Sequence, residues 1–227
     1  MLQSNKTSSG MTLLEVAVAS SILGVVILLS MGFVVQIQGT IKTASIKGDT
    51  QASAQLVMDR VTKLLEKTNR RDFDPSMIEN RWAIPPATLN PHYSIFVFTP
   101  LTVNASQQVI VGPTTMALKV EDDPADPHDG ADNNGNGITD EKTLTLHFDY
   151  NAATKQGTTK TKLAGNIELQ QTGDGISYWP VFESMGYFNS TQNYAVKIRL
   201  TFAKKDPANS SIVRTSVENT IFSVTYK

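Results

Sequence analysis

The chain has 227 residues, with 20 lysines and arginines against 21 aspartates and glutamates, so its formal net charge is −1. This balance excludes nucleic acid as an electrostatic partner, because phosphate binding needs a surplus of positive charge. The lack of cysteine excludes disulfide frameworks, thiolate zinc sites and cysteine nucleophiles, and a hydrophobic content of 40% argues against a disordered chain.

The first distinctive segment is an apolar run that follows a short polar leader. Residues 1–10 read MLQSNKTSSG, and no charged residue occurs between Val16 and Ile41. About 20 apolar residues span a bilayer as a helix, so the run predicts a membrane-spanning segment. The alternatives are a plain anchor and a secretory signal peptide. A signal peptide needs a small-residue cleavage site after the run, and residues 43–45 offer only a poor one.

Glu15 directly precedes the uncharged part of this apolar run. A carboxylate at membrane depth costs about 2–3 kcal/mol, so we expect it to have a function. The string Gly10-Met11-Thr12-Leu13-Leu14-Glu15, followed by an apolar helix, resembles the prepilin signature of type IV pilins and type II secretion pseudopilins. Met11 departs from the phenylalanine that is usual in this family.

The resemblance implies a processing and assembly pathway. A prepilin peptidase would cleave between Gly10 and Met11 and methylate the new N-terminus. Glu15 would then act in filament assembly, where its carboxylate can pair with the N-terminal amine of a neighbouring subunit. Removal of the ten-residue leader would leave 217 residues, which is long for a major pilin and favours a minor pilin or pseudopilin at or near the tip.

The same resemblance implies where the protein works and with what. It would be a single-pass protein of the inner membrane with its head in the periplasm, and filament-associated after assembly. Its partners would be membrane lipid, other pilins or pseudopilins, the prepilin peptidase and the inner-membrane assembly platform. The expected fold is α+β, with a long N-terminal helix packed on an antiparallel sheet. The sequence does not distinguish a secretion pseudopilin from a pilus subunit.

The helix is expected to continue beyond the membrane. No proline occurs before Pro75, so nothing sterically ends a helix between Thr12 and about Asn69. Apolar residues recur at helical spacing in its second half, at Ala54, Val57, Met58, Val61, Leu64 and Leu65. We therefore predict a leader at 1–10, a transmembrane or filament-core half at 11–41, an amphipathic half at 42–70 and a β-rich head at 71–227. The alternative is a helix broken between Gly39 and Gly48.

The head shows strand patterns. Residues 93–98 form a short β-branched and aromatic run, and residues 143–150, 194–202 and 212–226 predict three longer strands. Strict alternation in these strands predicts a sheet with one buried face. Leu144, Leu146, Phe148 and Tyr150 would point to the core, and Thr143, Thr145, His147 and Asp149 to the polar face. In the second of these strands the core residues would be Tyr194, Val196, Ile198, Leu200 and Phe202.

An acidic, glycine-rich loop lies at 121–142. Residues 132–140 satisfy the pattern D-x-[DN]-x-[DN]-G and resemble the calcium loops of EF-hand, dockerin and thrombospondin-type repeats. The predicted ligands of Ca²⁺ are Asp132, Asn134, Asn136, the carbonyl of Ile138, and Asp140. The twelfth position holds Thr143 instead of glutamate, so Glu141 or an acid between Asp122 and Asp129 would have to complete the shell. The alternative is a solvated acidic turn.

Catalytic motifs are missing from the sequence: it contains no nucleophile elbow, P-loop, zinc-protease helix motif or dinucleotide fingerprint. The sequence therefore favours a non-enzymatic structural subunit of a type IV-like filament. The alternative is a membrane-anchored, calcium-dependent binding or adhesion module.

Overall fold

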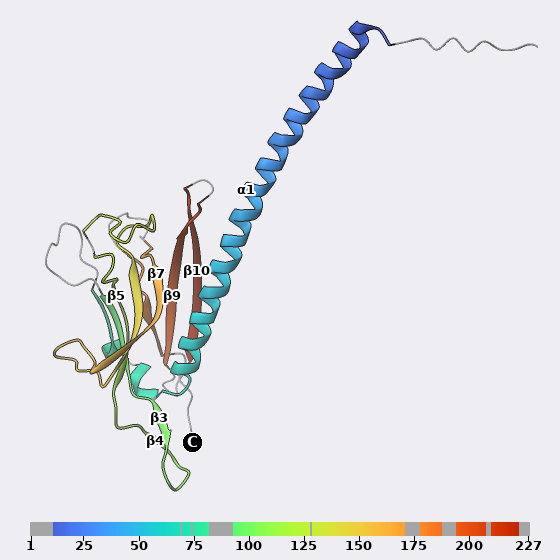
Figure 1. The fold of residues 1–227 in the computed structure, drawn as a ribbon. Coiled ribbons are helices and arrows are strands. Elements are labelled where there is room, and N and C mark those ends of the chain that lie inside the picture. The colour runs from blue at the N-terminus through green and yellow to red at the C-terminus, as the bar shows by residue number, and fades with distance from the viewer. Residues whose placement is uncertain are drawn as a thin grey trace, which may run out of the picture. The chain divides into compact units, whose positions relative to one another are not determined.

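The computed structural model of the chain describes residues 11–68, 70–73, 75–81, 93–127, 129–170, 178–187, 194–207 and 210–222. It divides into two compact units, Met1–Ala44 and Ser45–Lys227. The helix α1, Leu13–Leu65, contributes its first part to one unit and its last part to the other (Figure 1). The fold is α+β, with one long helix and one large antiparallel sheet.

Helix α1 runs for 53 residues without interruption, so a break between Gly39 and Gly48 is not observed. It ends where the sequence loses its helical spacing: the backbone N–H and the hydroxyl of Thr68 both donate to the carbonyl of Leu65, at 3.1 and 2.7 Å. These bonds satisfy a carbonyl that the helix itself leaves unpaired at its end.

Short elements connect the helix to the strands. Two 3₁₀ turns, η1 (Arg70–Phe73) and η2 (Pro75–Met77), follow α1. The strands are β1 (Ile78–Arg81), β2 (Tyr93–Phe98), β3 (Leu101–Val103), β4 (Val109–Val111), β5 (Met116–Asp122), β6 (Lys142–Phe148), β7 (Thr159–Ile167), β8 (Phe182–Tyr187), β9 (Tyr194–Lys205) and β10 (Ile212–Phe222).

The large sheet has the strand order β1-β2-β5-β6-β7-β9-β10, and β8 also pairs with β9. Its strand pairs are antiparallel. Strands β7 and β9 meet at a single register position, Ile167 opposite Phe202. Strands β3 and β4 form a separate two-stranded sheet.

The core forms between the second half of α1 and one face of the large sheet. The helix residues that are buried there are Thr50, Ala54, Val57, Met58, Val61 and Leu65, and Leu64 is partly buried against them. They pack on side chains such as Phe96, Leu118, Leu144, Ile198 and Leu200. One polar contact joins the same surfaces, because Asn219 Nδ2 donates to Thr62 Oγ1 at 2.8 Å. The predicted helix face is confirmed.

The predicted solvent face of residues 143–150 is wrong for Thr143, Thr145 and His147, whereas Asp149 is exposed as predicted. Thr143, Thr145 and His147 are 2%, 5% and 0% exposed, so β6 is buried on both faces. Tyr150 is buried too, but in the cluster on the opposite side of the sheet from Leu144, because Asp149 takes a left-handed φ of 47° and interrupts the alternation.

The segment after β6 provides the cover for this second face. The Gly157 N–H donates to His147 Nδ1 at 3.1 Å, and Lys119 Nζ donates to the carbonyl of Lys155 at 3.3 Å. Alternation identifies the residues that share a face, whereas burial of that face depends on whether the loop after the strand folds back over it.

Candidate functional site

The start of α1 is the first candidate site. Gly10, the predicted cleavage position, lies outside the described residues, and Met11 is 73% exposed. Thr12 and Glu15 form a reciprocal pair: Thr12 N donates to Glu15 Oε2 at 2.8 Å, and Glu15 N donates to Thr12 Oγ1 at 3.3 Å. This is a capping box, which satisfies backbone N–H groups that begin a helix unpaired.

The capping box gives Glu15 a role within its own chain that the sequence analysis missed, although Thr-x-x-Glu was the signal for it. The hydrogen bonds to Glu15 use Oε2, and within the described residues none is found to Oε1. Glu15 is exposed in this structure, so its carboxylate is open to contact from outside the chain.

The apolar half of α1 has an uncovered surface. Among the described residues, one helix is long and apolar enough to cross a membrane, and none of its most apolar 18-residue window is buried. Its few hydroxyls bond within the helix: Ser20 Oγ donates to the carbonyl of Val16 and Ser30 Oγ to that of Val26, each at 2.7 Å. Polar groups satisfied in this way need no water, so the surface suits lipid or other apolar helices.

The second candidate site is the loop between β5 and β6. The side chains of three predicted ligands each accept a backbone N–H from within the loop. Gly137 N donates to Asp132 Oδ2 at 2.6 Å. Asn136 N donates to Asn134 Oδ1 at 3.0 Å, and Ile138 N donates to Asn136 Oδ1 at 2.9 Å. The structure thus brings Asp132, Asn134 and Asn136 into one coiled loop. Ile138 is 3% exposed and anchors the loop in the protein.

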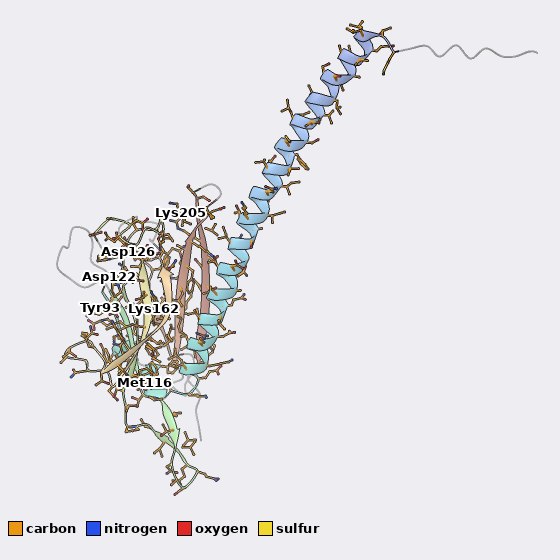
Figure 2. The ribbon with its side chains drawn as sticks, viewed as in Figure 1. Tyr93, Met116, Asp122, Asp126, Lys162 and Lys205 are labelled. Carbon is orange, nitrogen blue, oxygen red and sulfur yellow. The ribbon has the colours of Figure 1, made fainter. Side chains whose placement is uncertain are left out.

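Gly137 has a φ of 86° and lies against the side chain of Lys205 from β9, where an added Cβ would come within 2.0 Å of Lys205 Cδ. The left-handed φ favours glycine at this position, whereas the flexible end of the Lys205 side chain can move aside from an added Cβ. The contact also brings the ammonium of Lys205 beside the loop, so one positive charge is present without a metal; Figure 2 shows Lys205 and the loop residue Asp126 on this side of the head.

Two buried acids hold the loop closed. Asp126 is fully buried and accepts N–H groups from Asn133 at 2.8 Å and Glu141 at 3.1 Å. Glu141, 2% exposed, accepts the side-chain amides of Asn134 and Asn136 at 2.8 and 2.6 Å. Glu141 therefore lies beside two of the predicted ligands, Asn134 and Asn136.

The predicted ligand Asp140 performs a different task in this structure. Its Oδ1 accepts the backbone N–H groups of Asp129 and Gly130, both at 2.9 Å, and its own φ is 56°. Asp140 therefore ties the start of the loop to its end.

The loop residues fit a calcium ion in part. Asp132 Oδ1 is buried and has no hydrogen-bond partner among the described residues, which is unusual for a carboxylate oxygen; a cation or an ordered water at this atom would satisfy it. Against this, the amide nitrogens of Asn134 and Asn136 face Glu141, and the described residues contain no cluster of three or more His, Cys, Asp or Glu suited to a metal. Binding would require those two amides to release Glu141.

A buried polar network on the second face of the sheet is a site that the sequence analysis missed. Lys119 is 5% exposed, and its Nζ lies 2.5 Å from Glu121 Oε2 and 5.6 Å from the centre of the Tyr93 ring. His147 Nδ1 accepts the Gly157 N–H, so the neutral ring carries its proton on Nε2 and donates it to Thr145 Oγ1 at 3.0 Å.

The network controls the ionisation of Glu121. Burial opposes ionisation of this carboxylate, but His147, Lys119 and Lys160 together lower its pKa from 4.5 to about 2. The His147 Nε2 atom lies 3.7 Å from Glu121 Oε1, too far for a good hydrogen bond, so we attribute the lowering mainly to Lys119.

This arrangement predicts loss of stability in acid. Glu121 stabilises the fold fully above its unfolded pKa of 4.5, and the stabilisation disappears as pH falls toward 2. The full shift corresponds to at most about 3 kcal/mol. In urea unfolding at pH 7 and pH 3, Glu121→Gln should lose stability at pH 7 and vary less with pH than the unchanged protein. Glu168→Gln, in an exposed pair with Arg214, is the control and should cost about 1 kcal/mol or less. Equal pH dependence of the unchanged protein and Glu121→Gln would contradict the prediction.

Comparison with protein-family models, with curated proteins and with solved structures finds no match for this chain.

Proposed function

We propose that the protein is a non-enzymatic structural subunit, a minor pilin or pseudopilin, of a type IV pilus-like or type II secretion filament. The observation that carries the proposal is the segment Gly10–Glu15 directly followed by one unbroken helix. The first half of that helix is apolar and uncovered, and its second half packs on an antiparallel sheet.

Each part of that segment supports a step of the proposed pathway. Gly10 would allow cleavage by a prepilin peptidase, and Met11 would become the N-terminus. The apolar half of α1 would hold the subunit in the inner membrane, with the head in the periplasm, and then pack among other subunits in the filament. This transfer requires a helix whose polar groups are satisfied internally, as those of Ser20 and Ser30 are.

The experiment that tests the proposal is a determination of the N-terminus. The full chain, extracted from membranes that contain a prepilin peptidase, should have the mass of residues 11–227 plus one methyl group. The same chain from membranes without the peptidase should retain its leader. A mature N-terminus at Met1, or beyond the apolar run, would refute the assignment.

A second candidate function is a membrane-anchored module that binds or adheres with the help of calcium. The specific observation that favours it is Asp132 Oδ1, buried without a partner in the described part of the loop. We propose that the loop binds Ca²⁺ through Asp132, Asn134, Asn136 and the carbonyl of Ile138, with Glu141 as the closing ligand in addition to the predicted Asp140. The ion would neutralise the loop's acids and close a long connection between two strands. This role is structural and is compatible with either function.

Calcium binding predicts a calcium-dependent melting temperature. Residues 42–227 should unfold at a temperature a few degrees higher in millimolar Ca²⁺ than in chelator. A calcium concentration ten times the dissociation constant adds about 1.4 kcal/mol to the free energy of unfolding. Asp132→Asn with Asp140→Asn should abolish the difference. Asparagine keeps an acceptor oxygen for the backbone bonds of Gly137 and Gly130, so the fold should survive the change.

The control for this pair is Asp59→Ala, which removes an exposed acid from α1 and should leave the calcium response intact. Mg²⁺ should substitute poorly, because it demands a tighter octahedral shell. Identical melting curves of the unmutated head in calcium and in chelator would show that the loop is a solvated turn closed by Glu141 and Lys205.

A further inference from the structure

The hairpin of β3 and β4 presents two different faces. In its register Leu101 lies opposite Val111, and Val103 opposite Val109. Directly opposed residues share a face and neighbours along a strand alternate. One face therefore carries the four aliphatic side chains of Leu101, Val103, Val109 and Val111, which we call the aliphatic face. Thr102 and Ile110 are on the other.

The hairpin is firmly held at both ends. At its base, Leu101 N donates to the carbonyl of Lys67, just beyond α1, at 2.7 Å, and Gly112 N donates to the carbonyl of Pro100 at 2.8 Å. At its turn, Asn104 Oδ1 accepts the N–H groups of Ser106 and Gln108 at 3.0 and 2.9 Å. Figure 1 shows the hairpin extending from the large sheet as a separate element. Its conformation is thus ordered before any partner binds.

The aliphatic face is exposed and uncharged. Val103, Val109 and Val111 are 66%, 50% and 50% exposed. No Asp, Glu, Lys or Arg occurs between Arg81 and Lys119. Free strand edges are normally protected from pairing by charged residues, above all lysine. The strands of this hairpin have none, so neither their edges nor the aliphatic face carries a charge that opposes a covering partner. The other face is less apolar, with Ile110 42% exposed beside Thr102.

Two observations define what covers it. The residues at the turn, 104–108, are Asn-Ala-Ser-Gln-Gln, so the most prominent part of the hairpin is polar and does not suit a lipid surface. The hairpin has only six strand residues, whereas each side of a standard interface has about 20–30. It is therefore too small to hold two free molecules together by itself. It needs a partner that is already attached elsewhere.

We propose that the aliphatic face packs against an uncharged, apolar surface on the head of the neighbouring subunit in the same filament. The inference rests on the proposed function, because the hairpin contact alone is too small. In a filament, packing between the apolar halves of the α1 helices would hold the neighbouring subunits together. Once they are joined, the heads meet at high effective concentration, and a small contact suffices to set their register. A charged partner surface would lose hydration here without gaining a counter-charge.

Single cysteines test the proposal, since the chain has none of its own. Val109→Cys is on the aliphatic face and Thr102→Cys is the matched control on the other face of the same hairpin. A membrane-impermeant maleimide should label both at similar rates in full-length protein dispersed in detergent. In filaments sedimented from the producing cells, Val109→Cys should react several-fold more slowly, with Thr102→Cys unchanged.

Charge substitution provides an independent measurement. Val109→Lys should reduce the share of the chain found in filaments several-fold, and Thr102→Lys should not. Both should still be cleaved after Gly10, which shows that they insert, and both should unfold at the temperature of the unchanged head, which shows that they fold. Equal labelling of both cysteines in filaments, or normal assembly of Val109→Lys, would overturn the hairpin contact and leave the filament assignment intact. Failure of the unchanged protein to appear in any filament would overturn both proposals.

Discussion

Replacement of Gly10 by alanine should leave the precursor uncleaved, so that the protein keeps its ten-residue leader and its full 227 residues. In the family that this segment resembles, the glycine is the key determinant of cleavage, because it has no side chain to obstruct the peptidase. The loss should be nearly complete. Intact mass of the membrane-extracted protein measures it, since precursor and product differ by the mass of the leader.

Gly24→Ala is the matched control for this substitution. It makes the same chemical change in the apolar half of α1, where an added Cβ meets no atom within 4 Å. This variant should be cleaved like the unchanged chain. Efficient cleavage of Gly10→Ala at the same bond would show that the peptidase does not read this glycine, and the prepilin assignment would lose its main support.

Substitution of Glu15 should separate processing from assembly. If its carboxylate pairs with the N-terminal amine of a neighbour, Glu15→Val should still be cleaved but should be depleted from filaments by roughly tenfold or more, because loss of one partner of a buried charge pair costs about 2–5 kcal/mol. The fraction of cleaved subunits in sedimented filaments gives the result.

The capping box makes a sharper experiment possible, because Glu15 has two roles to distinguish. Glu15→Gln keeps a side chain that can bond back to Thr12 N but removes the charge. Thr12→Ala removes the hydroxyl that accepts Glu15 N and keeps the charge, at a cost of about 0.5–2 kcal/mol to the helix end. We expect Glu15→Gln to fail in assembly and Thr12→Ala to succeed. The opposite pattern would show that Glu15 acts only as a cap.

Local patterns in the sequence determined the helix and much of the sheet. The spacing of Ala54, Val57 and Val61 identified the buried face of α1, and the lack of proline predicted its continuity. The alternation in β9 identified Val196, Ile198, Leu200 and Phe202 as core residues. These predictions succeeded because an apolar stripe on a helix or strand needs only its own spacing to be recognised, and one buried face is enough to explain it.

The capping box and the contacts that close the acidic loop could be predicted from the sequence only in part. Thr12 and Glu15 show the capping pattern in sequence, but the apolar run beside them favoured an interpretation based on the charge of Glu15. Glu141 was one of several acids that could complete the loop, and only the folded turns bring it to the amides of Asn134 and Asn136. A sequence rich in Asp, Asn and Gly leaves such pairings undetermined, because many arrangements satisfy the same short pattern.

Tertiary structure alone decided the second face of the sheet. His147 lies on a polar, alternating face, yet it is fully buried because the segment around Gly157 folds over it and donates to its ring. Lys119 and Glu121 are two residues apart on β5, and only that cover makes their pairing a buried one. The strand order, in which β9 lies between β7 and β10, likewise depends on contacts between distant segments. The spacing of residues determines which side chains share a face, but burial and pairing depend on which other segment of the chain folds onto that face.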